Sequence, residues 1–110
     1  MTSHVFDAEG TQHVFYIAGY EQNIVKLWWK GSGGVQPEDL TDRSGGAPLA
    51  DDFRGEPISH VVKAERTQHV FYASLLETGA HQVIELWSEQ GATFSHVIWA
   101  HRSMQPLADI

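Results

Sequence analysis

The chain has 110 residues, a formal net charge of −7 with histidine neutral, and no cysteine. This length allows one domain, and the negative charge argues against binding of nucleic acid or of an anionic membrane surface. The lack of cysteine excludes disulfides, thiol nucleophiles and thiolate metal sites. No apolar run approaches the roughly 18 residues that span a membrane, and no signal peptide is visible. We therefore expect cytoplasmic synthesis without membrane insertion, and release by another route stays open.

Short strands separated by turns follow one another along the first half of the chain. Residues 3–6 are the first strand candidate, and the hexapeptide TQHVFY at residues 11–16 starts the second, which is β-branched and aromatic without a helical period. Residues 24–29 form the third strand, and large apolar groups on both of its faces indicate that both are packed. Residues 35–40 form a weaker strand that Pro37 restricts to an edge, and we expect no helix.

The second half of the chain repeats the first. The hexapeptide TQHVFY returns unchanged at residues 67–72, residues 83–88 correspond to the third strand, and residues 94–101 form a fourth. The spacing between matching segments changes only inside loops, as expected when duplicated strand units diverge. The sequence therefore predicts two repeats, residues 1–58 and 59–110, each with four short antiparallel strands.

The repeat length indicates the fold class. A period of about 40 to 60 residues with four strands per unit is typical of a β-propeller blade, so we expect an all-β chain of two blades. A two-sheet sandwich is the alternative, but it does not explain the repeat. Two blades are too few to close a propeller. Either several copies come together or the sequence is a piece of a longer chain. We expect the first, a head-to-tail ring closed by oligomerisation of identical chains, with three chains preferred over four.

Several motifs resemble those of a known family. Gln-His-Val followed by aromatics occurs in both repeats, a strand with Leu-Trp lies at residues 24–29 and 83–87, and Asp-Leu-Thr at residues 39–41 precedes Gly-Ala-Pro at residues 46–48. These motifs, which cover most of the chain, resemble the repeat of bacterial propeller lectins of the Photorhabdus type. The resemblance implies a β-propeller that binds fucose and related, sometimes O-methylated, sugars at repeated sites without catalysis. Small propeller lectins that close a ring from three two-blade chains are an architectural parallel.

A sugar site needs an aromatic face that stacks on the C–H face of a pyranose, together with polar groups that bond its hydroxyls. Trp28 and Trp87 are equivalent in the two repeats, so we expect them first to pack between blades. Trp29 and Trp99 lack such a match and are the better stacking candidates. Two tyrosines end the hexapeptides next to loops that differ. The aromatic candidates for sugar binding are thus Trp28, Trp29, Trp87, Trp99, Tyr16 and Tyr72.

The polar candidates are two arginines and one carboxylate. Arg43 and Arg102 match across the repeats after the fourth strand, and a guanidinium fork can hold two sugar hydroxyls. Glu85 lies in an apolar strand, where a carboxylate needs a partner such as a sugar hydroxyl or a backbone amide. The first repeat has Lys26 at the position of Glu85.

Other function classes have little support. The seven histidines form no HxH or HExxH cluster, so we expect them to act as hydrogen-bonding residues and expect no metal or cofactor. No GxSxG, P-loop or nucleophile beside a base is present, and we expect no enzyme. The expected partners are fucosylated or methylated glycans and further copies of the chain. The alternative is a non-catalytic propeller scaffold for protein interaction or self-assembly, without a sugar site.

Overall fold

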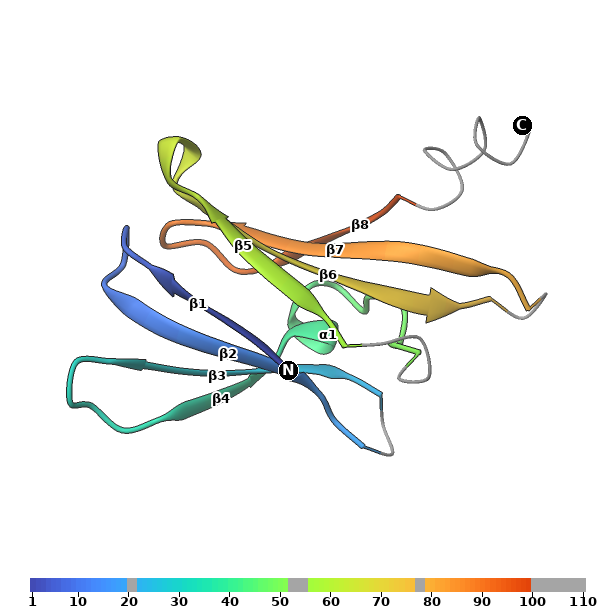
Figure 1. Cartoon of the computed structure of the whole chain (residues 1–110), viewed down its shortest axis with the longest axis horizontal. Coiled ribbons are helices and arrows are strands. Elements are labelled where there is room, and N and C mark those ends of the chain that lie inside the picture. The colour runs from blue at the N-terminus through green and yellow to red at the C-terminus, as the bar shows by residue number, and fades with distance from the viewer. Residues whose placement is uncertain (20–21, 52–55, 77–78, 100–110) are drawn as a thin grey trace.

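The computed structural model describes residues 1–19, 22–51, 56–76 and 79–99. They form two four-stranded antiparallel sheets, one from each repeat, which confirms the all-β prediction (Figure 1). The first sheet contains β1 (Thr2–Phe6), β2 (Thr11–Ile17), β3 (Ile24–Lys30) and β4 (Gln36–Asp39), in that order. The second contains β5 (Ile58–Val62), β6 (Thr67–Leu75), β7 (His81–Glu89) and β8 (Ser95–Ile98), also in that order.

Two short helical segments accompany the sheets, where the sequence predicted none. They are the helix α1 (Leu40–Arg43) and the 3₁₀ turn η2 (Lys63–Glu65). The predicted strand over residues 35–40 ends early because the Asp39 carboxylate accepts a hydrogen bond from the Asp42 amide and caps α1. No helix among the described residues is long and apolar enough to cross a membrane.

The two hexapeptides have the same register in their sheets. His13 lies opposite His4, and His69 lies opposite His60. On the other side of the hexapeptide, Phe15 pairs with Lys26 as Phe71 pairs with Glu85. Equivalent residues of the two repeats therefore occupy equivalent places in the two sheets.

Side chains alternate between two faces of each sheet, which we name by the residues that they carry. The histidine face carries His4, His13, Phe15, Lys26 and Trp28 in the first sheet, and His60, His69, Phe71, Glu85 and Trp87 in the second. The glutamine face carries Gln12, Val14, Tyr16, Leu27 and Trp29 in the first sheet, and Gln68, Val70, Tyr72, Leu86 and Ser88 in the second.

The sheets stack front to back. In the first sheet the histidine face is inside, where Phe15 is completely buried, whereas in the second sheet the glutamine face is inside, where Val70 and Leu86 are completely buried. The glutamine face of the first sheet and the histidine face of the second are thus left on the outside. The two layers and the adjacent strands β1 and β5 are visible in Figure 1.

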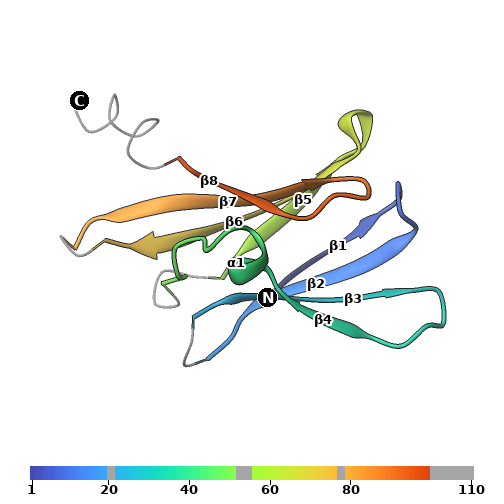
Figure 2. The same cartoon turned by 180° about the vertical axis from the view of Figure 1, so that it is seen from behind.

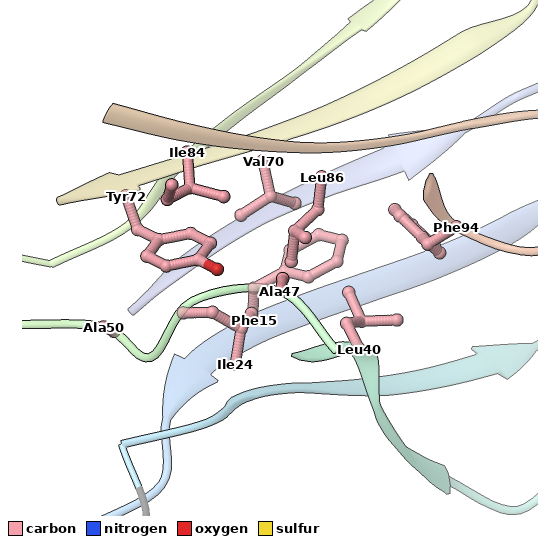
Figure 3. Packing of buried hydrophobic residues seen from close by; sticks show 10 residues of the cluster. All are labelled: Phe15, Ile24, Leu40, Ala47, Ala50, Val70, Tyr72, Ile84, Leu86 and Phe94. Carbon is pink, nitrogen blue, oxygen red and sulfur yellow. The ribbon is translucent and has the colours of Figure 1, made fainter. Parts of the chain in front are cut away.

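The core lies between these two inner faces (Figure 3). It consists of Phe15, Ile24, Leu40, Ala47, Ala50, Val70, Tyr72, Ile84, Leu86 and Phe94. Burial of each large side chain stabilises the fold by about 1.5–3 kcal/mol, so the packing of the two sheets dominates the stability.

The connection after β4 fills one end of the space between the sheets (Figure 2). Its helix contributes Leu40 to the core, and the loop that follows contributes Ala47 and Ala50. The Thr41 hydroxyl accepts a hydrogen bond from the Ile24 amide at 2.8 Å, which fixes α1 on β3. This connection is therefore part of the core.

Candidate functional site

A cleft of about 250 Å³ opens between the two sheets beside the core. The histidine face of β2 and β3 forms one wall, and β6 with the turn between β7 and β8 forms the other. Its lining combines aromatic, cationic, anionic and amide groups: Glu9, His13, Lys26, Trp28, Glu38, Gln68, Gly91, Ala92, Thr93 and Phe94. A concave site with an aromatic wall and a few convergent polar groups is the usual form of a small-molecule site.

Lys26 is the cation of the cleft. Its side chain is only 8 % exposed, and its Nζ lies 3.3 Å from Oε1 of Glu38 on the adjacent strand β4. The same Nζ lies 5.0 Å from the ring centre of Phe94 and 5.6 Å from that of Trp28, within the range of cation–π attraction. The ammonium and its carboxylate thereby lie beside two aromatic rings, one from β3 and one from the turn between β7 and β8.

His13 lies behind this group as a neutral imidazole. Burial lowers its pKa from 6.5 to about 3, with smaller contributions from the nearby Lys26 and His4. Its Nε2 shares a 2.7 Å hydrogen bond with the Thr11 hydroxyl, whereas its Nδ1 has no hydrogen-bond partner among the described residues. A buried polar atom without a partner costs stability, and a hydrogen bond to Nδ1 would remove that cost.

Gln68 is fixed at the cleft by bonds from both sheets. Its Oε1 accepts from Nε2 of His4 across the sheets at 2.7 Å, and its Nε2 donates to the Ser88 hydroxyl at 3.0 Å. Burial lowers the pKa of His4, and the bond with Gln68 offsets part of that decrease. The amide is fully buried, so its position does not depend on solvent.

Two turns are joined at the mouth of the cleft. The Glu9 carboxylate accepts a hydrogen bond from the Gly91 amide at 2.8 Å, and the Gln90 side-chain amide donates to the Ala8 carbonyl at 2.8 Å. These bonds connect the turn after β1 to the turn after β7. They hold the two walls at a fixed separation on the solvent side.

The second sheet carries a counterpart of these side chains on its outer face. Glu85 accepts hydrogen bonds from Nδ1 of His69 and, at 2.7 Å, from Nε1 of Trp99. The rings of His60 and His69 are stacked with their centres 4.9 Å apart, and Phe71 stacks on His60 at 5.6 Å. This preformed group of rings lies on the histidine face of the second sheet, which among the described residues does not pack against the first sheet.

The structure separates the residues predicted for sugar binding into several places. Trp28 lines the cleft. Trp29 and Tyr16 lie on the outer glutamine face of the first sheet, and Glu85, Trp87 and Trp99 belong to the outer histidine face of the second. Arg43 is exposed at the end of α1, and Arg102 lies outside the described residues.

Tyr72 has a different place from the one expected. It was predicted to end its strand beside a variable loop, but β6 continues to Leu75 and Tyr72 is buried in the core. Its hydroxyl donates to the Pro48 carbonyl at 2.6 Å, and burial raises its pKa above the ordinary value. Tyr72 is therefore a packing residue in this chain, and it does not line the cleft.

Of the residues that line the cleft, only Trp28 was a sequence candidate. The side chains on which its chemistry depends but which were not candidates include His13, Lys26, Glu38, Gln68 and Phe94. The one signal for them was Lys26, a charged residue between the apolar positions of a strand with two tryptophans. Glu38 becomes the partner of Lys26 only through the pairing of β3 with β4, which the sequence does not give. Gln68 contacts His4 only because of the way in which the two sheets stack.

Comparison of the chain with protein-family models, with curated proteins and with solved structures gave no match. Among the described residues, no group of three or more His, Cys, Asp or Glu side chains is arranged to hold a metal ion. The function of the cleft is therefore inferred from its residues and their geometry.

Proposed function

We propose that the chain is a carbohydrate-binding module, a lectin without catalytic activity, and that the cleft between its sheets binds the sugar. The observation that carries the proposal is the combination of Trp28 and Phe94 with Lys26 and Glu38 in one cleft. The aromatic rings offer faces for the C–H groups of a pyranose, and the ion pair offers a donor and an acceptor for its hydroxyls.

The buried back of the cleft adds directional groups. In the described part of the chain Nδ1 of His13 has no hydrogen-bond partner, and the amide of Gln68 is held in place by His4 and Ser88. The resemblance of the repeats to propeller lectins favours fucose or an O-methylated sugar as the ligand. The methyl group of such a sugar would contact Trp28 or Phe94, where apolar surface is buried on binding.

We also propose that the two sheets are consecutive blades of a β-propeller that further copies of the chain complete. Front-to-back stacking supports this arrangement, because it leaves two unlike faces outside, the glutamine face of the first sheet and the histidine face of the second. If the two outer faces were alike, copies would pair into a closed dimer. Unlike faces form heterologous contacts, and these generate a ring when the rotation closes. Three chains remain the preferred number, and native mass spectrometry at several protein concentrations measures it.

The sugar proposal is tested with a glycan array that carries fucosylated, O-methylated and unrelated glycans. We expect retention of the first two classes and a loss of affinity of about tenfold in Trp28→Ala, which equals about 1.4 kcal/mol. Leu49→Ala is the control, since Leu49 is an exposed loop residue that lies off both sheet faces and does not line the cleft. The conservative Glu38→Gln should also weaken binding, with an unchanged circular dichroism spectrum.

One observation favours the alternative of a protein-interaction scaffold without a sugar site. The outer faces carry exposed apolar side chains, with Val5 54 % and Ile58 65 % exposed. If no glycan is retained, or if Trp28→Ala and Glu38→Gln bind as the wild type does, the sugar proposal is wrong and the scaffold is favoured.

A further inference from the structure

We propose that the two outer faces dock onto each other in successive copies and that this contact builds a second binding cleft, in which Glu85 takes the place of Lys26. This inference rests on the proposed completion of the propeller by further copies. It adds which surfaces meet, which residues of a second copy enter the site, and how the chemistry of that site differs.

Each outer face is a copy of a face that the chain already buries. Val14 is half-buried outside, while its counterpart Val70 is completely buried inside. Phe71 is half-buried outside, while its counterpart Phe15 is completely buried inside. The histidine face of the second sheet therefore fits the glutamine face of another first sheet, as the packing within one chain shows.

The packing inside the chain predicts individual contacts between copies. His4 bonds Gln68 across the sheets, so the exposed His60 is expected to bond the exposed Gln12 of a second copy. Glu9 accepts from the amide of Gly91, so its counterpart Glu65 is expected to accept from the turn over residues 31–34 of a second copy.

Trp99 is expected to be the anchor of this contact. It occupies the position that corresponds to Leu40, which is completely buried between the two sheets, yet Trp99 itself is 43 % exposed. Its indole donates to Glu85, which fixes the ring on the outer histidine face. Large aromatic side chains at the centre of an interface carry a disproportionate share of the binding energy.

The second cleft has a different charge from the first. Its counterparts of Lys26 and Glu38 are Glu85 and Val97, so a carboxylate replaces an ion pair. His69 and Trp87 would form its wall with Gln12 of the second copy. A carboxylate accepts from hydroxyl or ammonium groups and repels other carboxylates, so this site should take a neutral or amino sugar and reject a sugar acid.

The docking is tested with two variants that each block one face. Val14→Arg blocks the glutamine face of the first sheet, and Phe71→Arg blocks the histidine face of the second, where the guanidinium has Glu85 beside it. Leu49→Arg, at an exposed loop position off both faces, is the control. Light scattering should find each blocked variant as a monomer and the control as the wild-type oligomer.

Mixing the two blocked variants gives the decisive result. One intact face of each kind remains, so the mixture should form a one-to-one heterodimer although neither variant associates alone. If either variant still self-associates, or if the folded mixture stays monomeric, the proposal is wrong. These outcomes are independent of sugar binding at the first cleft, which both blocked variants retain intact.

The second cleft is tested by titrating glucosamine and galacturonic acid into the wild-type oligomer by calorimetry. We expect glucosamine to bind, a loss of affinity of at least tenfold in Glu85→Gln and in the Phe71→Arg monomer, and no binding of galacturonic acid at this site. Unchanged glucosamine affinity in the monomer would contradict a site shared between copies. Absence of glucosamine binding to the wild type would contradict its proposed chemistry.

Discussion

Lys26 and Glu85 occupy the same position in the two repeats with opposite charges and nearly equal burial, at 8 % and 7 % exposure. Each lies opposite the phenylalanine of its hexapeptide. Lys26 pairs with Glu38 inside the chain, whereas Glu85 accepts from His69 and Trp99 on an outer face. Both repeats thus have a charged side chain at this position, but its sign and all of its partners differ between them.

The partners of Glu85 lead to a stability prediction. Glu85→Ala leaves Nδ1 of His69 and Nε1 of Trp99 without this acceptor, and hydrogen bonds to a charged group contribute about 1.5–3 kcal/mol. We expect the substitution to decrease the free energy of unfolding by an amount within that range. Urea denaturation at one protein concentration measures the decrease. Glu89→Ala, at an exposed position at the end of the same strand, is the control and should change it by less than about 0.5 kcal/mol. If Glu85→Ala and Glu89→Ala changed the free energy of unfolding equally, the hydrogen bonds of Glu85 would not contribute to stability.

The repeated tyrosines offer a second matched pair. Tyr72→Phe removes a buried hydroxyl and leaves the Pro48 carbonyl without its donor, which should cost about 1 kcal/mol of unfolding free energy. Tyr16→Phe makes the same chemical change on the outer glutamine face and should cost less than about 0.5 kcal/mol in the monomeric Val14→Arg background. A larger effect at Tyr16 than at Tyr72 would contradict the inside-outside assignment of the glutamine faces.

The strands were predictable from the sequence because alternation and the repeated hexapeptide are local properties. The two copies of TQHVFY form equivalent strands, β2 and β6, with equivalent neighbours. The fourth strands were predicted too long: β4 ends where Asp39 caps α1, and β8 ends at Ile98. Residues 100–101 of the prediction lie outside the described residues.

The inner face of each sheet was not predictable from the repeated string. His13 is buried and His69 is half-buried although their local sequences are the same, because the order of stacking decides which face is covered. The cleft combines residues from both sheets, so its membership depends on that order too. Trp28 was a sequence candidate through its equivalence with Trp87, although it was expected first to pack between blades. Gln68 and Phe94 could be identified only from the packing of the second sheet against the first.

A third prediction concerns the equivalent glutamines of the two hexapeptides, Gln12 on the outer glutamine face and Gln68 on the inner one. Gln68→Ala removes the partner of His4 and of Ser88 in the buried interior, and it should lower the unfolding free energy by about 1–3 kcal/mol at every protein concentration. Gln12→Ala changes an exposed residue and should leave the monomer unchanged. Under the proposed docking it weakens association, so its effect should appear only as a higher concentration for half-assembly in light scattering.

Acid should destabilise the chain between about pH 7 and 5 through His13. Its pKa is lowered to about 3 in the folded chain by burial first and then by Lys26 and His4, while an unfolded histidine titrates near 6.5. The carboxylates of Glu9 and Glu38 line the same cleft. In this window the unfolded chain binds a proton that the folded chain does not, so stability falls with decreasing pH, by up to about 1.4 kcal/mol per unit. Urea midpoints should therefore fall from pH 7 to 5, and less steeply in His13→Gln; equal slopes would contradict a buried neutral His13.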